Sequence, residues 1–133
     1  MNIVLTGSSG FIGSHLKNLL KDCGYRVICL SRDSKQCHKK DYFTFEDYFL
    51  GKIDCKIDYF LHLASPNFDY CKEDILKAGI VDLTNQIIKT LSIYECRKFI
   101  YFSSAKVYGE PSFKNNLFSE QSILNPLTDY AKA

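Results

Sequence analysis

Three glycines between a short apolar run and a helical pattern form the part of this sequence best suited to bind an anion. The stretch TGSSGFIGSHL directly follows the run NIVLT and places its glycines at intervals of three. Gly7 permits a tight turn, Gly10 has no side chain to block a phosphate, and Gly13 lets a helix pack closely. The first amides of that helix lack backbone partners and carry a partial positive charge, which favours a diphosphate.

We therefore predict that this turn binds a dinucleotide. Its spacing is GxxGxxG rather than the commoner GxGxxG, and a turn that serves packing alone is the alternative interpretation. The predicted contacts with the dinucleotide come from the whole stretch between strand and helix: Gly7, Ser8, Ser9, Gly10, Phe11, Ile12 and Gly13.

The end of the second apolar run bears on which dinucleotide binds. In proteins that bind a dinucleotide at a glycine turn, an acidic residue about 20 residues past the glycines accepts hydrogen bonds from the ribose 2′-hydroxyl. Here Ser31 and Arg32 occupy that place. A serine and a guanidinium can bind a 2′-phosphate, which a carboxylate would repel. The sequence therefore favours NADP; the alternative is NAD, with Arg32 in solvent and Asp33 on the ribose.

Alternating strands and helices must position these residues. Apolar runs predict strands over 2–6, 25–30, 41–45, 58–63 and 98–103, and helical spacing predicts helices over 11–21, 46–50 and 72–94. Residues 110–129 have a loop composition. This order predicts an α/β fold, a Rossmann-type doubly wound parallel sheet truncated to about its first five strands, with helices on both faces.

Composition limits the classes of protein that fit. With 133 residues, 46% hydrophobic, the chain is expected to form one domain over 1–133. The net charge of +2 does not favour nucleic acid as a partner, and no apolar run approaches the ~20 residues of a membrane span. Six scattered cysteines, without CxxC spacing, predict no metal site. The start MNIVLTG does not resemble a signal peptide, so we expect reduced thiols in a cytoplasmic protein.

Four ordered motifs resemble the extended short-chain dehydrogenase/reductase family, the NAD(P)-dependent epimerases and dehydratases of sugar nucleotides. The start MNIVLTGSSGFIGSHL is similar to the glycine fingerprint of that family, residues 58–65 (DYFLHLAS) to its DxVxHLAA strand, and residues 103–109 (SSAKVYG) to its SSxxVYG strand end. Tyr130 falls where the tyrosine of a YxxxK pattern would fall. The resemblance covers nearly the whole chain. It implies that Leu63, Ala64 and Ser65 line the cofactor.

The resemblance also implies a catalytic pair, Ser104 and Tyr130. Ser104 would hold the substrate oxygen, and Tyr130 would move a proton on and off that oxygen. Tyrosine has a pKa near 10, and a lysine one helical turn later lowers it through its charge. That lysine would be residue 134, one beyond the last residue of this sequence, and Lys132 lies on the wrong side of a helix to replace it. Family dehydratases carry an Asp-Glu pair after the hydroxyl, and Ala105 and Lys106 stand there instead, so we do not expect dehydration.

Two further expectations concern the strands and the last residues. His62, within an apolar strand, is expected to be a structural residue rather than a catalyst. The strand over 98–103 is expected to be an exposed edge, which favours self-association into a homo-oligomer. We expect no room for a helix to form at Tyr130.

Taken with the resemblance, these residues predict the N-terminal portion of an NAD(P)-dependent oxidoreductase or epimerase. The full-length protein would act on a nucleotide sugar, as a keto-sugar reductase or a 4-epimerase. We expect this portion to lack the substrate domain and to be inactive alone. The alternative is a non-catalytic dinucleotide-binding module or a truncated pseudoenzyme.

Overall fold

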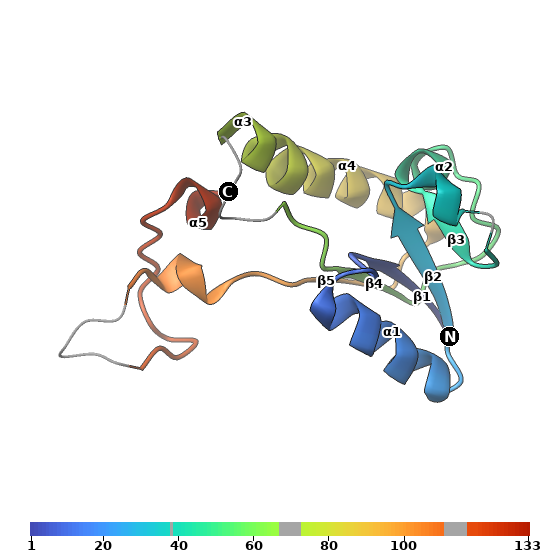
Figure 1. The fold of residues 1–133 in the computed structure, drawn as a ribbon, viewed down its shortest axis with the longest axis horizontal. Helices are drawn as coiled ribbons and strands as arrows, with labels where there is room; N and C mark the ends of the chain where they lie inside the picture. The colour runs from blue at the N-terminus through green and yellow to red at the C-terminus, as the bar shows by residue number, and fades with distance from the viewer. Residues whose placement is uncertain (38, 67–72, 111–116) are drawn as a thin grey trace. The chain divides into compact units, whose positions relative to one another are not determined.

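The computed structural model of this protein describes residues 1–37, 39–66, 73–110 and 117–133. Five parallel strands form one sheet in the order β3-β2-β1-β4-β5 (Figure 1). The strands are β1 (Asn2–Thr6), β2 (Arg26–Ser31), β3 (Tyr42–Thr44), β4 (Tyr59–His62) and β5 (Lys98–Tyr101). The parallel sheet with flanking helices confirms the predicted Rossmann-type class.

Helices connect the strands and follow the last of them. They are α1 (Phe11–Asp22), α2 (Phe45–Phe49), α3 (Glu73–Leu76), α4 (Leu83–Thr90) and α5 (Asp129–Lys132). Single 3-10 turns add Ser34–Gln36, Leu91–Tyr94 and Ala105–Tyr108, and a π-helical segment covers Lys77–Asp82.

The chain divides into two compact units, which we describe separately. The sheet unit comprises Met1–Ser65 and Leu83–Phe102, and the second unit comprises Pro66–Asp82 and Ser103–Ala133. All five strands, α1, α2 and α4 belong to the sheet unit, whereas α3 and α5 belong to the second unit.

The sheet unit has a core on each face of its sheet, because successive strand residues point to opposite sides. Val4 and Phe60 pack with Ile87 of α4 on one face. Ile3 and Leu5 pack on the other, where side chains of α1 cover them. Figure 1 shows α1 and α4 on opposite sides of the sheet, which is the doubly wound arrangement. Strand β5 pairs with β4 alone among the described residues, and self-association through its open edge stays a prediction.

The long helix predicted over 72–94 differs in detail; residue 72 lies outside the described residues. Helical structure is continuous from 73 to 94, but it changes from α to π at Lys77 and back to α at Leu83. The π segment contains Gly79, where an added Cβ would lie 2.4 Å from Cγ of Pro66. Any side chain at Gly79 would displace Pro66, so this glycine serves a close approach of the chain, which the apolar periodicity did not reveal.

Three observations concern membrane-spanning helices, metal ligands and cysteines. Within residues 1–37, 39–66, 73–110 and 117–133, no helix has the length and apolarity that a membrane crossing needs. In the same described part, no three His, Cys, Asp or Glu residues gather as metal ligands would. The five described cysteines, Cys23, Cys29, Cys37, Cys55 and Cys96, carry free thiols, and Cys71 lies outside the described residues.

Candidate dinucleotide site

The glycine loop after β1 is held by contacts that exclude side chains at two of its three glycines. Gly7 has a φ of 71°, and an added Cβ would lie 2.9 Å from the carbonyl carbon of Leu63. A Cβ on Gly13 would lie 2.1 Å from the carbonyl oxygen of Gly7. At Gly10 an added Cβ would meet only that same oxygen, at 3.3 Å. The fold itself therefore requires Gly7 and Gly13, whereas Gly10 leaves space that the protein does not fill.

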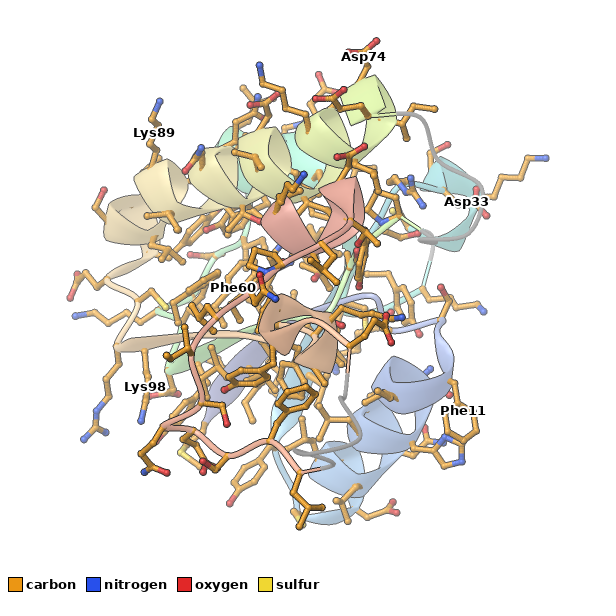
Figure 2. The ribbon with its side chains drawn as sticks, turned by 90° about the vertical axis from the view of Figure 1, so that its left-hand side faces the viewer. Phe11, Asp33, Phe60, Asp74, Lys89 and Lys98 are labelled. Atoms are coloured by element: carbon orange, nitrogen blue, oxygen red, sulfur yellow. The ribbon has the colours of Figure 1, made fainter. Side chains whose placement is uncertain are left out.

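Helix α1 begins at this space with its first amides uncapped by a side chain. Gly10 is the N-cap residue; its amide donates to the carbonyl oxygen of Gly7 at 3.0 Å, and it makes no side-chain cap. The first turn contains no acidic residue that would satisfy the helix dipole. Phe11 and Ile12 are 83% and 60% exposed, and Figure 2 shows Phe11 on the outer surface of α1. The helix start is therefore open to an anionic ligand.

The sheet topology brings the end of β4 beside this loop. The strand order reverses between β1 and β4, and ligands of open α/β sheets bind at such a switch point. The hydroxyl oxygen of Thr6 accepts hydrogen bonds from the amides of Leu63, at 3.1 Å, and Ala64, at 3.0 Å. Ser65, which follows, is exposed, whereas Ser8 in the loop is buried and Ser9 exposed. The structure thus brings together the two segments that the sequence predicted separately.

The end of β2 carries the residues predicted to choose between NAD and NADP. Arg32 is exposed. The hydroxyl oxygen of Ser31 accepts a hydrogen bond from the amide of Asp33 at 3.0 Å. The carboxylate of Asp33 in turn accepts from the amide of Lys35 at 3.0 Å, as the N-cap of a 3-10 turn. The side chain of Asp33 therefore has a local structural role, and a contact with the ribose stays a prediction.

His62, at the end of β4, is fully buried and both of its ring nitrogens have partners. Nδ1 lies 2.6 Å from the hydroxyl oxygen of Thr6, and Nε2 lies 3.1 Å from that of Thr84 in α4. Its removal from water lowers the pKa of His62 from 6.5 to about 4. His62 thus has the burial and the hydrogen-bond partners of a structural residue, and the absence of a catalytic role stays a prediction. The sequence did not reveal its partners, because Thr6 and Thr84 are 56 and 22 residues away.

The two predicted catalytic residues lie in the second unit, and their placement against the glycine loop stays a prediction. The hydroxyl oxygen of Ser104 accepts the amide of Lys106 at 3.2 Å and so begins the 3-10 turn Ala105–Tyr108. Tyr130 is half-buried in α5, which lies against that turn and against α3.

The expectation that no helix forms at Tyr130 was wrong. One α-helical turn forms because the hydroxyl of Thr128 accepts the amide of Ala131 at 3.2 Å and caps it. Lys132 lies 3.7 Å from the carboxylate of Asp129. Two residues along a helix from Tyr130, Lys132 lies on a different face of that turn, as expected.

The second unit also contains a pocket of about 480 Å³. Rings of Tyr108 and Phe118 stack in its wall, with centroids 5.5 Å apart. Its lining residues are Tyr108, Glu110, Leu117, Phe118, Gln121, Ser122, Ile123 and Asn125. None of them was predicted as a site residue. Because no helix start lies among these residues, the glycine loop remains the better candidate for binding a dinucleotide.

Comparison with known proteins gives consistent matches over nearly the whole chain. The model of the NAD dependent epimerase/dehydratase family matches residues 3–133. The chain is 31% identical over 136 residues to UDP-glucose 4-epimerase of Yersinia enterocolitica, which covers 85% of this chain and 40% of that protein. It is 29% identical over 160 residues to dTDP-D-glucose 4,6-dehydratase of Dictyostelium discoideum, covering 97% of this chain and 37% of that one. The chain thus spans less than half the length of these relatives.

The fold also matches that of a solved structure over nearly the whole chain. The crystal structure of UDP-glucuronic acid 4-epimerase from Bacillus cereus in complex with UDP-glucuronic acid and NAD superimposes with a TM-score of 0.76 at 28% identity. The match covers 99% of this chain and 48% of that one.

Proposed function

Since this chain belongs to the NAD dependent epimerase/dehydratase family, we propose that its sheet unit binds NAD or NADP at the glycine loop and that the complete protein acts on a nucleotide sugar. The observation that carries this proposal is the uncapped start of α1 beside Gly10, at the switch point between β1 and β4. Open amides at a helix start and a glycine that leaves space are what a diphosphate needs.

The described residues fit such a ligand. The backbone amides of Phe11 and Ile12 would bind the diphosphate, while Leu63, Ala64 and Ser65 would line the remainder of the cofactor. A bound nicotinamide would supply the chemistry of hydride transfer to or from a sugar carbon.

In the second unit, Ser104 and Tyr130 would handle the oxygen of the substrate. Because the hydroxyl oxygen of Ser104 already accepts an amide, its own hydrogen is left to donate to that oxygen. Tyr130 would move the proton. Lys106 and Ala105 carry no carboxylate, which favours keto-sugar reduction or 4-epimerisation over loss of water. The relatives that act on UDP-glucose and bind UDP-glucuronic acid support a UDP-sugar as substrate of the complete protein.

The alternative is a module that binds a dinucleotide without catalysis. Lys132 pairs with Asp129 and lies on a different face of the helical turn from Tyr130, so it does not occupy the place of the lysine in a YxxxK pattern. Steady-state turnover of UDP-glucose or UDP-glucuronic acid by this chain would rule out the module. A cytoplasmic location is part of the proposal and accords with the free thiols of the five described cysteines.

Gly10→Ala tests the binding site directly. Gly10 has φ −72° and ψ 170°, which any residue adopts, and the new methyl group meets only one protein atom, at 3.3 Å. The fold should therefore persist, while the methyl group enters the space proposed for the diphosphate. We expect the dissociation constant for NADH or NADPH, measured by nucleotide fluorescence, to rise about tenfold or more. Asn18→Ala, on the exposed face of α1, is the matched control and should bind as the unchanged chain does. Equal binding by the Gly10 variant would refute the site.

Arg32→Gln tests the choice between NAD and NADP. If Ser31 and Arg32 bind a 2′-phosphate, the loss of one charge-assisted pair should weaken NADPH by about tenfold and leave NADH unchanged. If Asp33 binds the ribose, Asp33→Asn should weaken NADH instead. NADP is favoured by the exposed guanidinium, and NAD by the bound NAD of the Bacillus cereus relative. Titration of both reduced cofactors against both variants decides between them.

A further inference from the structure

The hydrogen bonds around Thr6 fix the tautomer of His62. A threonine hydroxyl has two acceptor sites and one hydrogen. The amides of Leu63 and Ala64 occupy both acceptor sites of Thr6, so its hydrogen is left for Nδ1 of His62, 2.6 Å away. Nδ1 must then be unprotonated. The neutral ring carries its proton on Nε2, which donates to the hydroxyl oxygen of Thr84.

We propose that His62 is a positioning residue for the dinucleotide site, acting through the orientation of the Thr6 hydroxyl. Nδ1 of His62 accepts a hydrogen bond from the Thr6 hydroxyl and so fixes the orientation of that hydroxyl. Both lone pairs of the Thr6 oxygen then point toward the amides of Leu63 and Ala64. That peptide forms the wall against which Gly7 packs, since a Cβ on Gly7 would lie 2.9 Å from the Leu63 carbonyl carbon and 3.0 Å from the Ala64 nitrogen. The chain Thr84–His62–Thr6 thus connects α4 to the shape of the cradle. Its effect on binding rests on the dinucleotide function proposed above.

A proton on Nδ1 would break this arrangement. The Thr6 oxygen would then face three donors with two acceptor sites, and one amide of the Leu63–Ala64 peptide would lose its partner. The groups that face the ring are Thr6 from β1, Thr84 from α4, Phe60 from β4, and Phe99 and Tyr101 from β5. None of these contacts brings a carboxylate that would stabilise the imidazolium. Loss of hydration instead favours the neutral ring.

The tautomer is tested first, and without any ligand. In long-range ¹H–¹⁵N spectra of the ¹⁵N-labelled chain at pH 7, we expect His62 to show an unprotonated Nδ1 and a protonated Nε2. Its signals are identified among the three histidines by their absence from His62→Phe. The same pattern should persist at pH 5.5, where an exposed histidine is largely charged. A protonated Nδ1, or rapid exchange between tautomers, would overturn the proposal.

Two variants then separate positioning from packing. His62→Phe keeps a ring but offers no acceptor, so amide hydrogen exchange at Leu63 and Ala64 should accelerate and the dissociation constant for NADH or NADPH should rise about tenfold. His62→Asn restores an acceptor near the place of Nδ1 and should recover slow exchange at both amides despite its smaller volume. Thr84→Val removes the bond of Nε2 and leaves that of Nδ1, so we expect smaller changes in exchange and affinity than for His62→Phe. Asn18→Ala, on the exposed face of α1, is the control and should change neither.

The outcomes distinguish this proposal from the one on which it rests. If the unchanged chain binds neither NADH nor NADPH, the dinucleotide function fails, while the tautomer and the two amides still decide whether His62 positions the turn. If the chain binds and the Phe variant loses affinity with unchanged exchange at Leu63 and Ala64, His62 acts by some other route and the proposal is overturned.

Discussion

In the sheet unit Val4, Phe60 and Ile87 are fully buried, whereas in the second unit Leu117 and Ile123 are 89% and 88% exposed. The difference follows from how each unit is built. Five paired strands with helices on both faces enclose two apolar cores, but single helical turns and connecting chain enclose little. The unit proposed to bind the dinucleotide therefore carries the stability of the chain. The unit with the proposed catalytic residues has few buried apolar groups to hold it.

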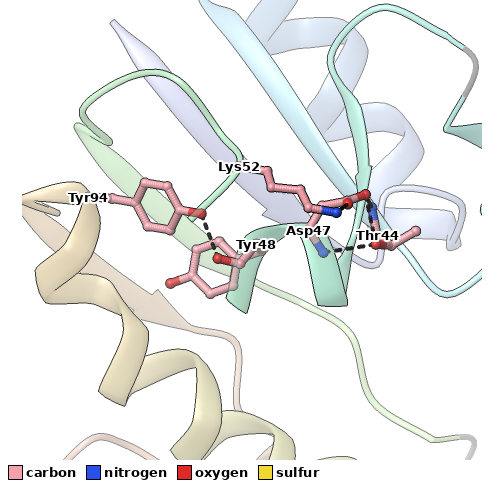
Figure 3. A network of polar contacts seen from close by, with 5 residues as sticks. All are labelled: Thr44, Asp47, Tyr48, Lys52 and Tyr94. Atoms are coloured by element: carbon pink, nitrogen blue, oxygen red, sulfur yellow. Dashed lines mark hydrogen bonds and ion pairs between the residues drawn. The ribbon is translucent and has the colours of Figure 1, made fainter. Parts of the chain in front are cut away.

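The largest expected effect comes from truncating Tyr48 of α2, whose ring pairs with that of Tyr94. Tyr48 is fully buried, stacks on Tyr94 with centroids 5.0 Å apart, and donates its hydroxyl hydrogen to the carbonyl oxygen of Ile87. The hydroxyl of Tyr94 donates to the carbonyl oxygen of Tyr48, as Figure 3 shows. Because Tyr48→Ala removes a large buried ring and its bond to α4, we expect the free energy of unfolding to fall by about 3–5 kcal/mol. Urea denaturation followed by circular dichroism measures it.

Ile123→Ala in the second unit is the matched control. Its side chain is already in contact with water, so its loss should change the free energy of unfolding by less than about 0.5 kcal/mol. An equal loss of stability in both variants would show that the second unit has an apolar core of its own and would remove the contrast between the two units.

The next largest effect is the pH dependence that His62 gives to the sheet unit. Because folding lowers the pKa of His62 from 6.5 to about 4, the unfolded chain takes up the proton more readily. The contribution of His62 to the free energy of unfolding is therefore complete above pH 6.5. It falls as the pH drops from 6.5 to 4, and it falls no further below pH 4. A pKa difference of about 2.5 corresponds to a maximum of about 3 kcal/mol.

The measurement compares the free energy of unfolding of the unchanged chain and of His62→Phe between pH 7 and pH 4. Carboxylates titrate in both proteins, so the difference between the two curves isolates His62. The free energy of unfolding of the unchanged chain minus that of His62→Phe should decrease steadily as the pH falls below 6.5. A difference that stays constant over this interval would mean that His62 is solvated or already charged in the fold, contrary to its burial.

The sequence predicted local features of the sheet unit and missed contacts between residues far apart in the chain. Strand β1 and the start of α1 were predicted to the residue, because an apolar run, a glycine turn and helical spacing follow each other directly in the chain. Local patterns do not record which distant residues meet. The bonds that Thr6 makes to His62 and the Leu63–Ala64 peptide, and the approach of Pro66 to Gly79, depend on how the chain folds back.

The helical turn α5 was missed for another reason. A cap of one hydroxyl on one amide suffices to begin a turn, and the Thr-Asp start at Thr128 was the available signal. The roles of Ser104 and Tyr130 were predicted from a family resemblance rather than from packing. Their local contacts are now described, and their roles stay a proposal.

The smallest expected effects come from two threonines that play the same local role in the two units. Thr44 accepts the amide of Asp47 at 3.0 Å and begins α2, and Thr128 accepts the amide of Ala131 at 3.2 Å and begins α5. Around Thr44 the cap is doubled, because Asp47 accepts the Thr44 amide and is itself bound by Lys52 (Figure 3). These hydrogen bonds, first from Lys52 and then from Thr44, lower the pKa of Asp47 to about 2.

We expect Thr44→Ala to lower the free energy of unfolding by about 1 kcal/mol, because α2 carries Tyr48 into the core. Thr128→Ala should leave that free energy unchanged to within about 0.5 kcal/mol while accelerating hydrogen exchange at the amide of Ala131. Both variants lose the same atoms. A difference between their free energies of unfolding therefore shows how strongly each capped turn is coupled to the rest of the fold. If Thr128→Ala cost as much as Thr44→Ala, α5 would have to unfold together with the sheet, and the catalytic residue proposed at Tyr130 would rest on as firm a support as the glycine loop.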